Sequence, residues 1–123
     1  MKFSAADQST GNFIHGYTEK SVEVNGSSFS RSLVIMQERI ISDWRPETFQ
    51  QLTENDFSEL LELGPDIVLL GTGPQQQFPI PGLYRSLIDA GIGVEIMTTP
   101  AACRTYNILT SEGRRVIAAL LFS

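Results

Sequence analysis

Two segments, residues 66–73 and 93–107, most strongly limit how this chain can fold. Each begins with a short apolar run typical of a buried strand and continues into a turn, and the second turn leads into a helical pattern. Parallel strands joined through helices end at the same edge of a sheet, where open α/β sheets usually bind ligands. The two segments therefore predict an α/β fold with both turns side by side at the carboxyl edge of the sheet.

The second half of the chain supplies further strands and helices to this arrangement. Alternating βα patterns predict strands at 66–71, 93–97 and 115–122 in one sheet, with helices near 53–62, 82–90 and 100–110 packed on it. The last strand is apolar on both faces, as central strands are. Thr53 and Asp56 form the pattern of a capping box at the start of the first helix. Gly91 suits the end of the second helix, and Pro100 suits the first turn of the third.

The first third of the chain is rich in strand patterns. A short strand is expected at 13–17, and residues 22–24 alternate apolar and polar side chains up to Asn25-Gly26. An Asn-Gly pair is strongly associated with two-residue hairpin turns. The return strand is expected to run from about residue 29 through residue 35, and residues 40–41 predict another short strand.

Composition and charge describe an ordinary soluble domain of 123 residues, 41% hydrophobic and 19% charged. We expect residues 1–11 to be a flexible lead-in and residues 12–123 to form a single domain. The net charge of −5 would repel phosphate backbones, so no nucleic-acid partner is expected. No apolar run approaches the ~20 residues that span a bilayer, and the start lacks the apolar core of a signal peptide. A cytoplasmic protein without membrane insertion is expected.

Residue types that carry catalysis or hold metals are few. The chain has one cysteine, Cys103, and one histidine, His15, which excludes an intrachain disulfide and a structural zinc site of His and Cys ligands. A Cys-His nucleophile is one interpretation, and the dipole of the third helix would then lower the thiol pKa. A cysteine beside Ala101 and Ala102 is more often a small core residue, so we expect it to be buried and chemically quiet. No catalytic residue, metal ligand or cofactor is assigned.

The turn at Gly71-Thr72-Gly73 has two interpretations. It lacks the flanking residues of the known phosphate loops, so a tight turn that needs glycine at positive φ is the simpler one. The alternative is that its backbone N–H groups bind a small anion.

The third helix carries a polar strip, because Arg104, Asn107 and Ser111 recur at helical spacing. In the functional interpretation, the strip lines a groove in which Arg104 binds an anionic group and Asn107 orients it. In the structural interpretation it is a solvated face, or Arg104 pairs with a carboxylate such as Asp66 or Glu95. The hypothetical ligand-binding set is Gly71, Thr72, Gly73, Thr99, Arg104 and Asn107.

Several motifs match one family in order along the chain. They are Asn25-Gly26, Ser32-Leu33, Trp44 and residues 65–73, 93–97, 101–107 and 118–120. The chain resembles a bacterial member of the small uncharacterised domain family that includes the mitochondrial respiratory complex I assembly factor and the adipogenesis-associated domain protein. The resemblance implies an α/β fold with a mixed central sheet, flanking helices and an additional N-terminal β-hairpin layer. It implies no established enzymatic activity.

Two functions follow from these observations. The first is a non-enzymatic interaction or assembly factor with a protein partner, supported by the resemblance and by the lack of a usable catalytic set. The second is a binding protein or enzyme for a small anionic ligand, with its site where the 71–73 turn meets the helix at 100–110.

Overall fold

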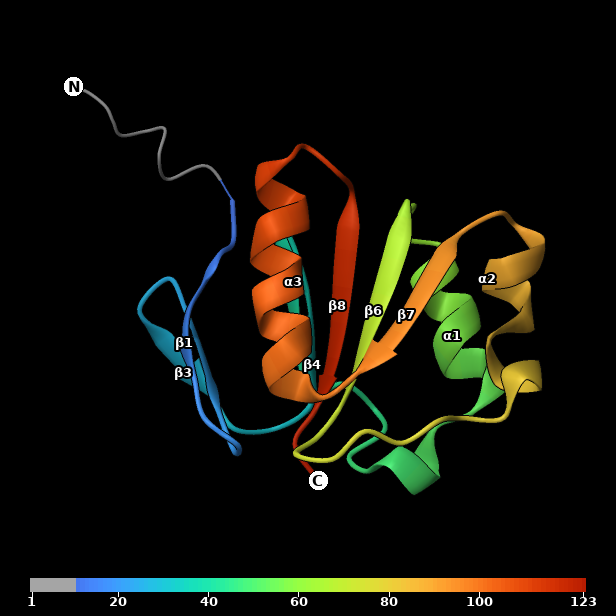
Figure 1. The fold of residues 1–123 in the computed structure, drawn as a ribbon, viewed down its shortest axis with the longest axis horizontal. Coiled ribbons are helices and arrows are strands. Elements are labelled where there is room, and N and C mark those ends of the chain that lie inside the picture. Colours follow the sequence, from blue (N-terminus) through green and yellow to red (C-terminus); the bar gives the residue numbers. More distant parts are fainter. Residues whose placement is uncertain (1–10) are drawn as a thin grey trace.

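The structure, a computed structural model, describes residues 11–123 and is built around a five-stranded sheet (Figure 1). The strand order is β5-β4-β8-β6-β7. The bounds are β4 (Leu33–Met36), β5 (Arg39–Ser42), β6 (Ile67–Thr72), β7 (Gly93–Met97) and β8 (Val116–Leu121). β6 runs parallel to β7 and β8, whereas β4 runs antiparallel to β5 and β8. The mixed sheet is confirmed, and the apolar β8 lies at its centre. The expected lead-in at 1–11 lies, apart from Gly11, outside the described residues.

A second sheet is formed by the N-terminal strands. It contains β1 (Ile14–Tyr17), β2 (Val22–Val24) and β3 (Ser27–Phe29), all antiparallel. The hairpin predicted from Asn25-Gly26 joins β2 to β3, with φ of 51° at Asn25 and 89° at Gly26. Two successive residues at positive φ match the twist of a tight hairpin, which is why this pair suits the turn. The additional β layer is confirmed and has one strand more than a hairpin.

The single return strand expected at 29–35 is wrong. β3 ends at Phe29 in the small sheet, and β4 begins at Leu33 in the large one. The chain changes sheets at Ser32, whose hydroxyl lies 2.9 Å from the Trp44 carbonyl oxygen and 2.7 Å from that of Pro46. The Trp44 N–H in turn donates to the Ser32 carbonyl at 2.9 Å. These bonds to residues 44 and 46 bend the chain between β3 and β4, although the local sequence pattern of residues 29–35 is that of a single strand.

The three predicted helices correspond to α1 (Glu54–Leu61), to η3 (Pro81–Tyr84) continuing into α2 (Arg85–Asp89), and to α3 (Thr99–Ser111). A short helix, η2 (Phe49–Gln51), was not predicted. The capping box is confirmed, because Thr53 accepts from the Asp56 N–H and the Asp56 carboxylate accepts from the Thr53 N–H. Gly91, at φ 79°, follows the end of α2.

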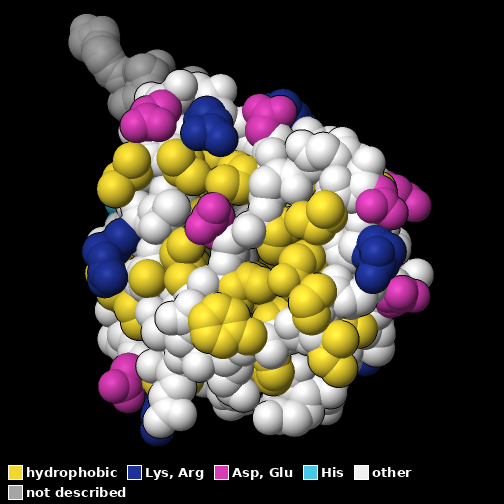
Figure 2. Space-filling view, turned by 45° about the vertical axis from the view of Figure 1, so that its right-hand side comes forward, with side chains coloured by type: hydrophobic (Ala, Val, Ile, Leu, Met, Phe, Trp, Pro, Cys, Tyr) yellow, Lys and Arg dark blue, Asp and Glu magenta, His cyan; other side chains and the backbone are white. Residues whose placement is uncertain are grey.

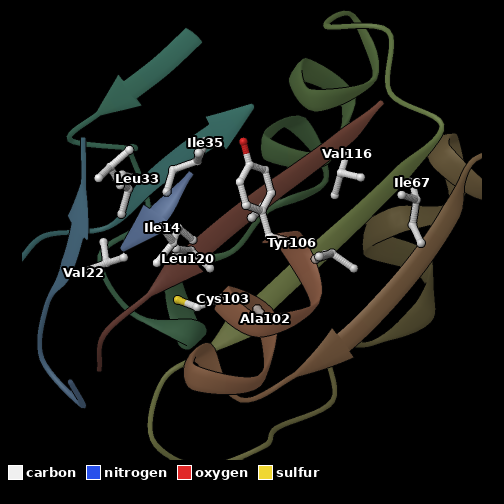
Figure 3. Close-up of a cluster of buried hydrophobic side chains, with 13 residues drawn as sticks. Ile14, Val22, Leu33, Ile35, Ile67, Ala102, Cys103, Tyr106, Val116 and Leu120 are labelled. Carbon is white, nitrogen blue, oxygen red and sulfur yellow. The ribbon is translucent and has the colours of Figure 1, made fainter. Parts of the chain in front are cut away.

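Helices cover both faces of the large sheet (Figure 1). α1 and α2 pack on one face, and α3 shares the other with the small sheet. Figure 3 shows the core on the α3 face, where Ala102, Cys103 and Tyr106 meet side chains of both sheets. Those side chains include Ile14, Val22, Leu33, Ile35 and Leu120. The packing of α3 against both the large and the small sheet decides where its polar side chains lie.

Candidate functional site

The 71–73 turn and the start of α3 meet, as the sequence predicted. The Thr99 N–H donates to the Gly73 carbonyl at 2.9 Å, and the Gly73 N–H donates to the Thr99 hydroxyl oxygen at 2.8 Å. The same hydroxyl donates to the Leu121 carbonyl. Thr99 is buried, so its side chain ties the ends of β6 and β8 to the first turn of α3.

The two glycines of the turn serve different needs. Gly73 adopts φ of 94°, which is the positive φ expected for a tight turn. Gly71 does not need positive φ, but a Cβ there would lie 2.8 Å from the Thr99 hydroxyl oxygen and 3.0 Å from Leu120 Cδ2. Its lack of a side chain is therefore what lets α3 approach β6.

Thr72 holds the turn closed from within. Its buried hydroxyl donates to the Gln75 carbonyl at 2.7 Å and accepts from the Gln77 N–H at 3.1 Å. The side chain therefore satisfies backbone groups of the segment that follows β6 and does not point to solvent.

The N–H groups at the start of α3 have partners within the chain. Thr99 donates to Gly73, and the next residue is a proline, which has no N–H. The Ala101 N–H donates to the Thr98 hydroxyl at 3.3 Å, and the Ala102 N–H donates to the Thr98 carbonyl at 2.9 Å. A helix start attracts anions chiefly through unpaired N–H groups, so an anion here would have to displace existing bonds.

Arg104 and Asn107 face the small sheet instead of the turn. The Asn107 amide donates to the Ile14 carbonyl at 2.7 Å and accepts from the Ile14 N–H at 2.9 Å. It thus pairs with β1 as a neighbouring strand would. Arg104 donates to the Tyr17 hydroxyl at 2.8 Å, with its guanidinium carbon 5.9 Å from the centre of that ring. Its partner is therefore Tyr17 and not Asp66 or Glu95.

The six proposed ligand-binding residues thus form two groups. Gly71, Thr72, Gly73 and Thr99 close the carboxyl edge of the sheet, whereas Arg104 and Asn107 fasten α3 to the small sheet. Tyr106 adds to the second group by donating to the Asn12 carbonyl at 2.8 Å. Binding of a small anion by all six stays a prediction.

Cys103 and His15 do not form a nucleophilic pair. Cys103 is fully buried in the core under α3, and burial raises the pKa of its thiol to about 12 (Figure 3). His15 lies on the exposed side of β1, with its ring nitrogen 3.2 Å from Asn25 Oδ1. The expected burial of the cysteine is confirmed.

An exposed apolar surface was missed by the sequence analysis. Phe78 is 73% exposed, Ile80 75% and Ile88 52%; these three residues are called the apolar patch below. Figure 2, which turns the α2 side of the molecule forward, shows apolar side chains gathered in the middle of the view and charged side chains mostly at its margin. The sequence Phe78-Pro79-Ile80-Pro81 could have indicated this surface. Its prolines disfavour a helix or a strand, and without such an element the large apolar side chains are not directed into the core.

Another missed contact joins Arg45 and Asp56. The guanidinium of Arg45 lies 2.7 Å from the buried carboxylate of Asp56, which also caps α1. Burial tends to raise the pKa of Asp56, but hydrogen bonds from Arg45 and Thr53 outweigh it and hold that pKa below its usual value. The group is therefore a charged structural anchor.

Comparison with known proteins identifies the family. Residues 14–121 match the family described as "Protein of unknown function (DUF498/DUF598)". The chain belongs to this family. It is 33% identical over 111 residues to "NADH dehydrogenase (ubiquinone) 1 alpha subcomplex assembly factor 3" of Bos taurus, a match that covers 89% of this chain and 60% of that protein. The chain thus spans 60% of the length of this curated relative.

Solved structures agree with the fold. A crystal structure of a Bordetella parapertussis protein superposes with a TM-score of 0.85 at 37% identity, over 91% of this chain and 96% of the other. A solution structure from Bordetella pertussis, described as a Mth938-like domain, gives 0.82 at 31% identity, over 98% and 92% of the two chains. The single α/β domain architecture and the predicted resemblance are both confirmed. Within residues 11–123, no helix is long and apolar enough to cross a membrane.

Proposed function

We propose that this domain is a non-enzymatic protein-interaction domain that acts as an assembly factor, and that it works in the cytoplasm. The apolar patch carries the proposal. It consists of three large apolar side chains, from the segment after β6 and from α2, that are each more than half exposed, and Figure 2 shows apolar side chains gathered on the side of the molecule that carries α2. Contiguous exposed apolar surface commonly marks a site where another protein binds. A relative with 33% identity is named as an assembly factor, which supports the same class of function.

The local backbone favours presentation of the patch to a partner. Pro79 and Pro81 flank Ile80 and restrict the backbone around it, so less conformational entropy is lost when a partner orders this segment. Pro81, Tyr84 and Ile88 line an adjoining hollow of about 130 Å³ that an apolar side chain of the partner would enter. We place a protein partner ahead of a small anion because the polar residues proposed for the anion already bond within the chain.

The test compares the patch with an exposed apolar residue on another face. A Phe78→Ser, Ile80→Ser double variant removes two patch side chains. Ile108→Ser is the matched control, because Ile108 is 57% exposed on α3. In the native host, a photo-crosslinking residue at position 80 should capture a protein partner that one at position 108 does not. That partner should co-purify with wild type and with the Ile108 variant, and be lost from the double variant at unchanged melting temperature.

The small-anion alternative is tested in the same preparations. If phosphate or citrate raises the melting temperature of wild type and Arg104→Ala abolishes the rise, the anion site is favoured. A double variant that keeps the partner at full affinity would contradict the interaction function proposed for the patch.

A further inference from the structure

We propose that β7 is a recognition edge that binds an extended segment of a partner protein, with a Lys or Arg side chain opposite Glu95. This inference rests on the proposed interaction function and specifies how the partner binds. β7 ends the strand order of the large sheet, so only one of its sides is paired, with β6. The unpaired side of such a strand can accept an additional strand from another chain.

The outward-facing backbone groups of β7 belong to Val94 and Ile96. The Gly93 N–H donates to the Asp66 carbonyl at 3.2 Å, so residue 93 directs its polar groups towards β6. Because backbone direction alternates along a strand, residues 95 and 97 also face β6, and Val94 and Ile96 face outward. Within residues 11–123, the one side-chain bond recorded to these outward groups is from Gln76 Nε2 to the Ile96 carbonyl, at 3.0 Å.

The edge of β7 differs from the β1 edge of the small sheet. The Asn107 amide already occupies the N–H and carbonyl of Ile14 in β1. β7 is five residues long, pairs in regular register with β6, and contains no proline, lysine or bulge. Those are three of the devices that protect a sheet edge from pairing, and a charged side chain is another. The single charge on β7 is Glu95, an exposed residue.

Charge favours a segment of another protein over a second copy of this chain. An antiparallel two-fold pairing that sets Val94 opposite Ile96 of a copy also sets Glu95 opposite Glu95. Like charges at directly opposite positions destabilise a strand pair, and each copy carries a net charge of −5. A basic side chain at the same position would instead be attracted to Glu95.

The alternation of side chains along β7 indicates which side chains the partner segment should carry. Val94 and Ile96 are half-buried against the core that contains Leu87 of α2, so their side chains lie on the α2 side of the sheet. Glu95 points to the opposite side, because successive side chains alternate. α2 also carries Ile88 of the apolar patch. The partner segment should therefore present apolar side chains on the α2 side and a basic one on the other.

Two blocked eight-residue peptides of alternating valine and threonine serve as probes. One has a central lysine and the other a glutamate at the same position. In an NMR titration the lysine peptide should shift the amides of Val94 and Ile96. It should bind about fivefold more tightly than the glutamate peptide, as expected for one cross-strand charge pair. The variant Glu95→Lys should reverse that preference.

The variant Ile96→Pro tests the backbone bonds. It removes an outward N–H without removing a bond to β6, and proline is tolerated at such edge positions. Peptide binding should fall at least tenfold while the spectra of β8 and α3 stay those of wild type. A lysine peptide N-methylated at alternate residues, which lacks the backbone donors, should fail to bind wild type and is a control that needs no variant.

Three results would overturn the proposal. They are equal binding of the two peptides, shifts mapped away from β7, and a dimer of the free protein that Ile96→Pro dissociates, which would make a second copy the occupant. If the native partner is lost from the Phe78, Ile80 double variant but kept by Ile96→Pro, the interaction function stands and the edge proposal fails. If both variants keep the partner, both proposals fail.

Discussion

Replacing Gly71 by alanine should destabilise the protein, whereas the same change at Gly93 should not. Both glycines lie in neighbouring strands of the large sheet, and neither adopts positive φ. They differ in the space beside them. A Cβ at position 71 would lie 2.8 Å from the Thr99 hydroxyl oxygen and 3.0 Å from the Thr99 Cα, whereas at position 93 the nearest atom is Ile67 Cγ1 at 3.4 Å.

The expected magnitude has three parts. Forcing a methyl group into packed surroundings costs about 1–3 kcal/mol. Displacing the Thr99 hydroxyl weakens its bonds to the Gly73 N–H and the Leu121 carbonyl, each worth about 0.5–1.5 kcal/mol. Replacing glycine by alanine also lowers the conformational entropy of the unfolded chain, which stabilises the folded state by about 0.4–1 kcal/mol. Gly71→Ala should therefore lower the free energy of unfolding by about 2–4 kcal/mol, and Gly93→Ala should leave it unchanged or raise it slightly.

Urea unfolding followed by circular dichroism measures both variants against wild type. Equal slopes in the three transitions would show that only native stability changed. If the free energies of unfolding of Gly71→Ala and Gly93→Ala differ by less than about 0.5 kcal/mol, the close approach of α3 to β6 is not what requires glycine at position 71, and the reasoning is refuted.

Three further predictions concern Asn107, Asp56 and Cys103. Asn107→Ala removes both bonds to the Ile14 backbone and should cost about 1–3 kcal/mol, with hydrogen exchange accelerated in β1–β3 before β6 and β8; uniform acceleration would contradict this. Burial opposes ionisation of Asp56, but the hydrogen bond from Arg45 outweighs burial and lowers the pKa of the carboxyl group in the folded protein. The ionised Asp56 therefore stabilises the fold at pH values above the ordinary pKa of 3.8, and this stabilisation is lost as the pH falls through the lower pKa of the folded state. Asp56→Asn should flatten the acid limb of a stability–pH profile, and an unchanged limb would exclude this role. Because burial raises the pKa of the Cys103 thiol to about 12, a thiol reagent at neutral pH should label it only at the rate of unfolding; fast labelling of the folded protein would revive the nucleophile interpretation.

Local patterns determined most of the secondary structure. The predicted helices at 53–62 and 100–110 correspond to α1 (Glu54–Leu61) and α3 (Thr99–Ser111), because caps and apolar periodicity act over a few residues. The same holds for the Asn25-Gly26 hairpin and for the two-faced apolar run that became β8. These features depend on neighbours along the chain, so the sequence carries them directly.

Tertiary structure decided the partners of the polar residues. Helical spacing placed Arg104 and Asn107 on one strip of α3, but their partners, Tyr17 and Ile14, lie 87 and 93 residues away. Likewise, the break between β3 and β4 depends on bonds from Ser32 to Trp44 and Pro46.

Contacts over such distances depend on how the two sheets close around α3, which no local periodicity encodes. For this reason the sequence by itself determined the α/β class, the elements and the meeting of the 71–73 turn with α3. The packed sheets decided that the polar strip fastens the small sheet, and they left the outer edge of β7 unpaired and the apolar patch exposed.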